Sequence, residues 1–123
     1  MNTISLPGTV LFPEQLEHIK EYMGILGEGA PATMKAFSDL HSAAGKPGAL
    51  DFKTKELIAL AIGVSLRCNG CIAFHTHDAL EAGATREEIM EALGVAVLMG
   101  GGPSVIYATH VVEALRQFES RKG

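Results

Sequence analysis

The sequence lacks a basic cluster, and it lacks any apolar segment long enough to cross a membrane. Its ten Lys and Arg residues are scattered and are not interleaved with aromatic residues, which argues against nucleic acid as the main partner. The longest nearly unbroken apolar run, residues 57–66, is shorter than the roughly 20 residues of a transmembrane helix. The N-terminus has neither the positive region nor the continuous apolar segment of a signal peptide. We therefore expect a cytoplasmic protein that binds neither membranes nor nucleic acid.

Charged residues are also scarce. They make up 20% of the chain, below the ~25% that is usual for soluble domains, and the net charge is −4. A small domain has much surface to cover, so this shortage predicts that part of the surface is buried between the subunits of a homo-oligomer. The 123 residues are 47% hydrophobic and contain no internal repeat and no long linker. They are therefore expected to form a single domain over residues 1–123.

Helix signals recur along the chain, with Gly and Pro between them, whereas strand signals are weak. Asp51 is placed to cap one helix, and Thr85 with Glu88 forms the capping-box signature of another. Six helices are expected: from Pro13 to Gly27, from Pro31 to Gly45, from the Asp51 cap to about Leu66, from about Cys71 to Ala82, from the Thr85 cap to the glycines at 100–102, and from Pro103 to the fraying tail at 119–123. The sequence thus predicts a compact all-α bundle.

The helical periodicity also predicts which side chains face the core. Inward positions include Leu26 in the first helix, Phe37 and Leu40 in the second, and Val105 in the sixth. The third helix is apolar nearly all round after Glu56, which predicts that it lies at the centre of the domain or at a subunit interface.

Both cysteines and two of the five histidines lie within residues 66–77, LRCNGCIAFHTH. Cys68 and Cys71 are three residues apart and Cys71 and His75 are four apart, so on a helix their Cβ atoms would be about 5–6 Å from one another on one face. A disulfide needs Cβ atoms closer, about 3.5–4.5 Å apart, which predicts that the cysteines lie at an irregular first turn. The intervening Asn-Gly pair gives the backbone that freedom. In a cytosolic protein such a pair is more typical of catalysis or metal binding than of a structural disulfide.

The position of Cys71 predicts an activated thiol. A free thiol has a pKa of about 8.5, so only about 3% of it is thiolate at pH 7. A helix N-terminus favours the anion, and the imidazole of His75, one turn away, can accept the proton. We therefore predict that Cys71 is the attacking thiolate and that Cys68 is the resolving thiol that closes the disulfide.

Two other interpretations of these residues stay open. In the first, Cys68, Cys71 and His75 are three ligands of a non-catalytic zinc site, with Glu56, His77 or water as the fourth. Structural zinc sites usually draw two ligand pairs from separate segments, and the sequence offers no second pair. In the other interpretation, both thiols are small buried side chains that only pack.

Other chemistry-bearing residues have simpler interpretations. His77 lies two residues past His75 and points to roughly the opposite side of the helix, where it is expected to be solvated or packed. His41 and His110 are isolated in the sequence and are expected at the surface or at a helix edge. Glycines 100–102 lack the Lys-Ser/Thr end of a phosphate loop, so they are expected to break a helix and to allow close packing.

The segment from Lys55 to Leu93, KELIALAIGVSLRCNGCIAFHTHDALEAGATREEIMEAL, resembles the alkylhydroperoxidase AhpD-like branch of the carboxymuconolactone decarboxylase superfamily. The likeness consists of a glutamate, a cysteine twelve residues later, the pattern C-x-x-C-x-x-x-H and then G-A-T-x-E-E-I. The helical tail to about residue 118 fits more loosely. The resemblance implies an all-helical, AhpD-like fold, a homo-oligomer that is commonly a trimer or a hexamer, and thiol-dependent peroxidase or disulfide reductase activity.

The resemblance also implies roles for single residues. Cys71 matches the peroxidatic thiol, Cys68 its partner, His75 the proton-relay histidine and Glu56 the carboxylate that supports it. A lipoyl- or thioredoxin-type dithiol protein would reset the pair, and no bound cofactor is required. The chain departs from the AhpD pattern at Gly70, where that type has a histidine, and it therefore has one potential base fewer.

Glu56 enters the site by resemblance alone, because its spacing does not place it there. In a simple antiparallel hairpin it is expected ~15 Å from the turn that carries the cysteines, and a carboxylate facing solvent is the alternative. A carboxymuconolactone decarboxylase-like lyase is the alternative activity. The decarboxylase branch of the superfamily generally lacks the cysteine pair, so the pair argues against it.

Overall fold

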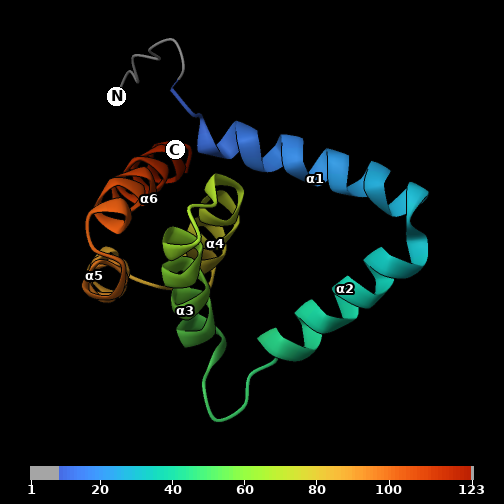
Figure 1. The fold of residues 1–123 in the computed structure, drawn as a ribbon, viewed down its shortest axis with the longest axis horizontal. Helices are drawn as coiled ribbons and strands as arrows, with labels where there is room; N and C mark the ends of the chain where they lie inside the picture. Colours follow the sequence, from blue (N-terminus) through green and yellow to red (C-terminus); the bar gives the residue numbers. More distant parts are fainter. Residues whose placement is uncertain (1–8, 123) are drawn as a thin grey trace.

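The structure, a computed structural model, describes residues 9–122. In that range the regular structure consists of six α-helices without a strand, which confirms the predicted all-α fold (Figure 1). The helices are α1 (Phe12–Gly29), α2 (Pro31–Gly45), α3 (Phe52–Ser65), α4 (Asn69–Glu81), α5 (Arg86–Gly100) and α6 (Gly102–Ser120). None of these helices combines the length and the apolar character that crossing a bilayer requires.

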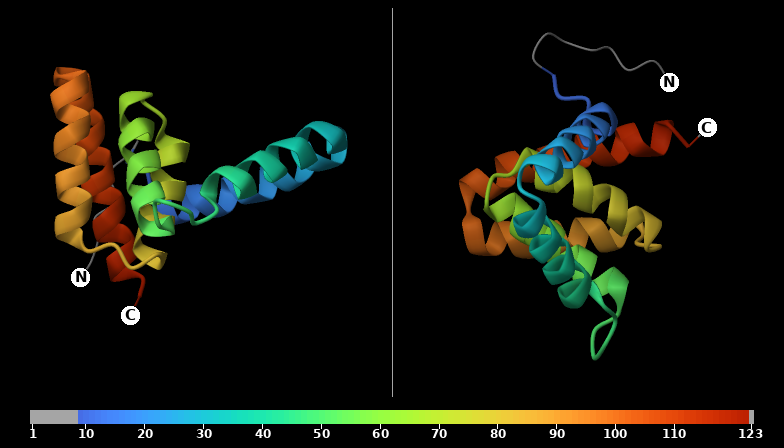
Figure 2. Two further views of the ribbon diagram at one scale, coloured as in Figure 1. Left: turned by 90° about the horizontal axis from the view of Figure 1, so that it is seen from below. Right: turned by 90° about the vertical axis from the view of Figure 1, so that its right-hand side faces the viewer.

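Helices α3 to α6 pack into a bundle, and α1 begins beside α4 and α6 (Figures 1 and 2). Each helix of the bundle contributes at least one fully buried apolar side chain, among them Leu60, Val64, Ile72, Ile89 and Leu115. Burying one such side chain stabilises the fold by roughly 1.5–3 kcal/mol. Most of the core therefore lies in α3 to α6, around the segment that carries the cysteines, and Phe12 and Leu16 of α1 complete it.

Both predicted helix caps are present. The backbone N–H of Thr54 donates to Asp51 at 2.8 Å, and this bonding lowers the pKa of the Asp51 carboxyl. Thr85 and Glu88 form a complete capping box, with bonds of 3.1 and 2.8 Å. The ammonium group of Lys53, 2.9 Å away, lowers the pKa of Glu88 and joins the first turns of α3 and α5. Local side-chain chemistry thus fixes where these two helices begin.

Two helix boundaries differ from the prediction by two residues. α1 continues past Gly27 to Gly29, and it ends where Pro31 follows Ala30, because a proline disfavours helical backbone at the residue before it. α4 begins at Asn69 rather than at Cys71, because Cys68 itself occupies the capping position.

The glycines at 100–101 separate α5 from α6, as predicted. A Cβ atom on Gly100 would collide with the hydroxyl of Ser104, a buried residue of α6. Gly101 has a φ of +66°, in the left-handed range that favours glycine. The glycines therefore allow both a sharp reversal and a close approach of the two helices.

Helices α1 and α2 extend to one side of the bundle (Figure 2, left). α2 has no buried residue, and Phe37 and Leu40, predicted to face the core, are 50% and 62% exposed. Leu26 and Val105 are also more exposed than predicted. Periodicity identifies the apolar face of a helix, but it does not say whether the surface that covers that face belongs to the same chain.

Gln117 of α6 attaches the start of α1 to the bundle, and it is only 4% exposed. Its Oε1 accepts the Phe12 N–H at 2.7 Å and its Nε2 donates to the Val10 carbonyl at 3.0 Å. We expect Gln117→Leu to lower the free energy of unfolding by about 1–3 kcal/mol, because it leaves a buried N–H without an acceptor. Urea unfolding measures this loss. The exposed neighbour Arg116, changed to Leu, is the control and should cost less than half as much.

Candidate active site

The cysteine pair lies at the turn between α3 and α4. Cys68 and Cys71 form a disulfide, with their Cα atoms 5.2 Å apart. The chain reverses through Arg67, which has a φ of 57°, and the N–H groups of Arg67 and Cys68 bond back to the carbonyls of Val64 and Gly63 at 3.0 and 3.1 Å. These are the bonds of a Schellman helix end. The irregular turn predicted for the cysteines is present.

Cys68 is the N-cap of α4, and its sulfur accepts the backbone N–H of Cys71 at 3.1 Å. The sequence predicted that the helix terminus would favour a thiolate at Cys71. The structure differs, because the capping residue receives the hydrogen bond and Cys71 supplies it. The helix terminus therefore favours an anion at Cys68.

Glu56 reaches His75, and its Oε1 lies 2.8 Å from the Nδ1 of the imidazole. Glu56 is 6% exposed, so the alternative in which it faces solvent is wrong. Glu56 was expected ~15 Å from the turn that carries the cysteines. His75 also lies about two helical turns away from that turn, so this distance does not keep Glu56 from His75. Gly63 lies against Cys71 and Glu56 lies against His75, which is the pairing of an antiparallel hairpin.

This contact orients the imidazole. A carboxylate is an acceptor, so Nδ1 carries the hydrogen and donates it to Glu56. Nε2 is then left with a lone pair that can take a proton. The side chain of His75 is 22% exposed and that of Glu56 is 7% exposed, so the pair is shielded but not sealed from solvent.

An apolar cavity of about 340 Å³ lies beside the disulfide. Its wall combines residues of the turn and of α4 with residues of α1 and α2. These residues are Ile19, Met23, Phe37, His41, Cys68, Gly70, Cys71, Phe74 and His75. A second cavity of about 270 Å³ borders His41, Glu56 and His75 and is lined mainly by α2 and α3. Both sulfurs and the histidine therefore face a space in which a small, largely apolar molecule can be held.

Two histidines missed by the sequence interpretation lie near this site. His41 of α2 lines the cavity, and the Nδ1 of His110 on α6 lies 2.9 Å from the Oδ1 of Asn69, which stands between the two cysteines. Neither has a neighbouring motif residue in the sequence. Only the packing of distant helices brings them close, so local spacing contained no signal for them.

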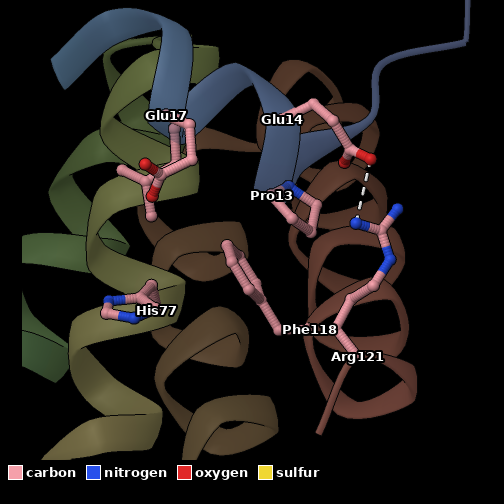
Figure 3. A pocket seen from close by; sticks show the side chains of 7 residues that line it. Pro13, Glu14, Glu17, His77, Phe118 and Arg121 are labelled. Atoms are coloured by element: carbon pink, nitrogen blue, oxygen red, sulfur yellow. Dashed lines mark ion pairs between the residues drawn. The ribbon is translucent and has the colours of Figure 1, made fainter. Parts of the chain in front are cut away.

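His77 lies elsewhere, in a separate shallow pocket (Figure 3). Its ring is 5.6 Å from that of Phe118, and its Nδ1 is 2.9 Å from the Oδ1 of Asp78. Arg121 pairs with Glu14 at 2.9 Å on the other side of this pocket. The structure therefore places His77 away from the cysteines, as a packed and hydrogen-bonded residue.

One cluster of potential metal ligands occurs within residues 9–122, and it consists of Glu56, His75 and Asp78. It contains neither cysteine, and the closest atoms of Glu56 and His75 already bond to each other. The two sulfurs are joined in the disulfide, so in this state they hold no zinc.

Comparison with known proteins gives close relatives along most of the chain. The chain is 42% identical over 106 residues to an uncharacterized protein of Cupriavidus necator, which covers 86% of this chain and 91% of that protein. The fold of this chain matches the crystal structure of a carboxymuconolactone decarboxylase family protein from Legionella pneumophila, with a TM-score of 0.85 and 47% identity. That match covers 87% of this chain and 96% of the Legionella chain.

A more distant similarity concerns the segment around the cysteines. The alkyl hydroperoxide reductase AhpD of Mycolicibacterium paratuberculosis is 35% identical over 68 residues, which is 55% of this chain and 38% of that protein. The model of the carboxymuconolactone decarboxylase family matches residues 31–114, from α2 to the middle of α6. The chain therefore belongs to the carboxymuconolactone decarboxylase family.

Proposed function

We propose that this protein is a thiol-dependent oxidoreductase of the AhpD-like type, which reduces a hydroperoxide or a protein disulfide. The observation that carries the proposal is the disulfide-forming pair Cys68–Cys71 in one cavity wall with His75, which Glu56 orients. A nucleophilic thiol, a base and a group that orients the base are the parts that covalent catalysis requires. The partial similarity to AhpD supports the same activity.

The reaction begins with the thiol of Cys71. His75 takes the thiol proton at Nε2, and the thiolate attacks the terminal oxygen of a hydroperoxide, so that the O–O bond breaks. The sulfur becomes a sulfenic acid, and the imidazolium returns its proton to the departing alkoxide. Cys68 then attacks the sulfenic sulfur, water leaves and the Cys68–Cys71 disulfide forms. With a protein disulfide as substrate, Cys71 forms a mixed disulfide that Cys68 resolves in the same way.

A reductant must supply two electrons and two protons to open the disulfide again. We propose a lipoyl- or thioredoxin-type dithiol protein for this step, in the reducing cytoplasm, where no bound cofactor is needed. Attack on the sulfur of Cys71 releases Cys68 as a thiolate, which the N–H of Cys71 stabilises.

The departure from the AhpD pattern at Gly70 has a structural counterpart. A Cβ atom on Gly70 would lie 3.1 Å from Cδ1 of Ile19, a residue of α1 that covers the turn. A histidine there requires the Ile19 side chain to shift by a few tenths of an ångström. In this protein the proton transfers therefore depend on His75.

A steady-state screen tests the proposed activity. Hydrogen peroxide, organic hydroperoxides and protein disulfides are offered with a dithiol reductant, and the wild type is compared with Cys71→Ser. Turnover of at least one substrate class is expected in the wild type only. A double variant, Cys68→Ser with Cys71→Ser, that turns over a small cyclic acid as fast as the wild type would instead support the lyase alternative.

We also propose that the protein is a homo-oligomer, a trimer or a hexamer, in which other copies cover its exposed apolar surface. Leu98 and Met99 of α5 are each 79% exposed, Met99 shares a groove with Ile58 and Ile62 of α3, and α2 has no buried residue. Monomers rarely leave so much contiguous apolar surface in water. A helix without any buried face is also unstable unless something packs against it.

Sedimentation equilibrium is expected to give a mass three or six times 13.0 kDa. Leu98→Glu should shift the mass toward smaller species, because a carboxylate would be buried at the contact. Glu91→Lys, an exposed charge reversal on the same helix, is the matched control and should leave the mass unchanged. A wild-type mass of 13.0 kDa would contradict the proposal.

A further inference from the structure

The turn between the two cysteines has few side chains that the rest of the protein can contact. Asn69 and Gly70 are its only residues, and Gly70 has no side chain. Asn69 is the first residue of α4, and its side chain is the single one inside the C-x-x-C turn. Ile19 of α1 lies against Gly70, but a hydrogen bond to a side chain of the turn must act on Asn69 or on the cysteines themselves.

Asn69 has such a contact. The Nδ1–H of His110 donates to the Oδ1 of Asn69 at 2.9 Å, across 41 residues of sequence. His110 lies in the middle of α6, next to the buried residue Val111, and its ring is 4.8 Å from that of Tyr107. α6 carries several core residues, so the donor belongs to the rigid part of the bundle.

We propose that His110 is a positioning residue for the cysteine pair and acts on it through Asn69. The proposal rests on the function proposed above only in requiring that Cys68 and Cys71 cycle between dithiol and disulfide. The hydrogen bond attaches the turn to α6, whereas His75, the proposed base, contacts Glu56 of α3. It restricts the turn to conformations in which the two sulfurs lie close together, and this raises the effective concentration of one thiol toward the other.

The contact is expected to affect the thiol–disulfide equilibrium of Cys68 and Cys71 as well as the rate at which the disulfide forms. The dithiol loses two electrons and two protons to an oxidised dithiol reagent, the Cys68–Cys71 bond forms, and the reagent is reduced. A turn that is already closed loses less conformational entropy in this step, so the disulfide is more stable. Without the His110 contact, Asn69 turns freely and the reduced pair opens.

The test is the thiol–disulfide equilibrium of the pair with oxidised and reduced dithiothreitol, read as the fraction of alkylated cysteine. His110→Ala is expected to lower the equilibrium constant for disulfide formation about three- to tenfold, the range of one hydrogen bond. A tenfold change raises the reduction potential by about 30 mV. His110→Asn keeps an N–H donor near the position of Nδ1 and should reverse at least half of this rise in the reduction potential. Asn69→Ala should reproduce the effect of His110→Ala without altering α6.

A double-variant cycle distinguishes positioning from a general loss of stability. If His110 acts through Asn69, then His110→Ala has no further effect in an Asn69→Ala background. Thr109→Ala, an exposed change at the preceding position of α6, is the control and should leave the equilibrium unchanged. The proposal is overturned if His110→Ala or Asn69→Ala changes the constant less than about twofold, or if their effects multiply.

The outcome does not depend on peroxide turnover. If the wild type lacks peroxidase activity but the variants show the expected shifts in reduction potential, the proposed peroxidase activity is refuted and the proposed role of His110 is retained. A wild type whose cysteines do not exchange with dithiothreitol at all would refute both.

Discussion

Cys71→Ser is expected to lower the rate of substrate reduction at least about a hundredfold, because a serine hydroxyl is not ionised at neutral pH and does not accept oxygen from a peroxide. Cys68→Ser is expected to behave differently. It should reduce one equivalent of hydroperoxide per subunit in a burst and then stop, because the sulfenic acid on Cys71 finds no second thiol. Stopped-flow peroxide consumption measures the burst, and trapping with a sulfenic acid reagent followed by peptide mass spectrometry locates the oxidised sulfur.

The structure makes this asymmetry a sharp test of the two roles. Cys68 receives the backbone hydrogen bond at the start of α4, which by itself favours a thiolate on Cys68. Cys71 has His75 one helical turn further along, and the Nδ1 of His75 is the nitrogen that contacts Glu56. A burst from Cys71→Ser, with the trapped sulfenic acid on Cys68, would show that the helix terminus outweighs the histidine and that the roles are exchanged. Unfolding of both variants in the presence of dithiothreitol controls for loss of structure.

The features that the sequence predicted correctly depend on residues close together in the chain. Asp51 with Thr54 and Thr85 with Glu88 are three residues apart, so the caps that begin α3 and α5 can be recognised from spacing alone. The same holds for the irregular turn at the cysteines and for the bounds of α2. Short-range hydrogen bonds and backbone preferences determine these features wherever the segment is placed.

The features that local spacing did not place depend on which helices come together. His110 and Asn69 are 41 residues apart and Glu56 and His75 are 19 apart, so contact between them requires the packing of α6 and α3 against α4. The resemblance supplied Glu56, whereas nothing in the pattern supplied His110. The exposure of Phe37 and Leu40 has another cause. Their periodicity predicts an apolar helix face that packs against something, and no surface in the described part of this chain covers that face.

Glu56→Gln is expected to lower kcat/KM about 10²- to 10⁴-fold, the contribution of a general base, although the side chain keeps its size. The carboxylate accepts the Nδ1–H of His75 at 2.8 Å and so leaves Nε2 able to take the proton of Cys71. An amide can turn its NH₂ group toward Nδ1, and the hydrogen of the imidazole then moves to Nε2. The base is lost although the histidine remains in place. Steady-state kinetics over a range of substrate concentrations measures the change, and KM should vary much less than kcat.

His75→Gln removes the base directly and should cost about as much as Glu56→Gln, within the same 10²–10⁴ range. Because both substitutions remove one function, the double variant should be no slower than either single variant. Losses that multiply would mean that Glu56 acts on the reaction independently of His75. Glu91→Gln, an exposed glutamate of α5, should leave kcat/KM unchanged, which separates the effect of this one buried carboxylate from a change in the charge of the whole protein.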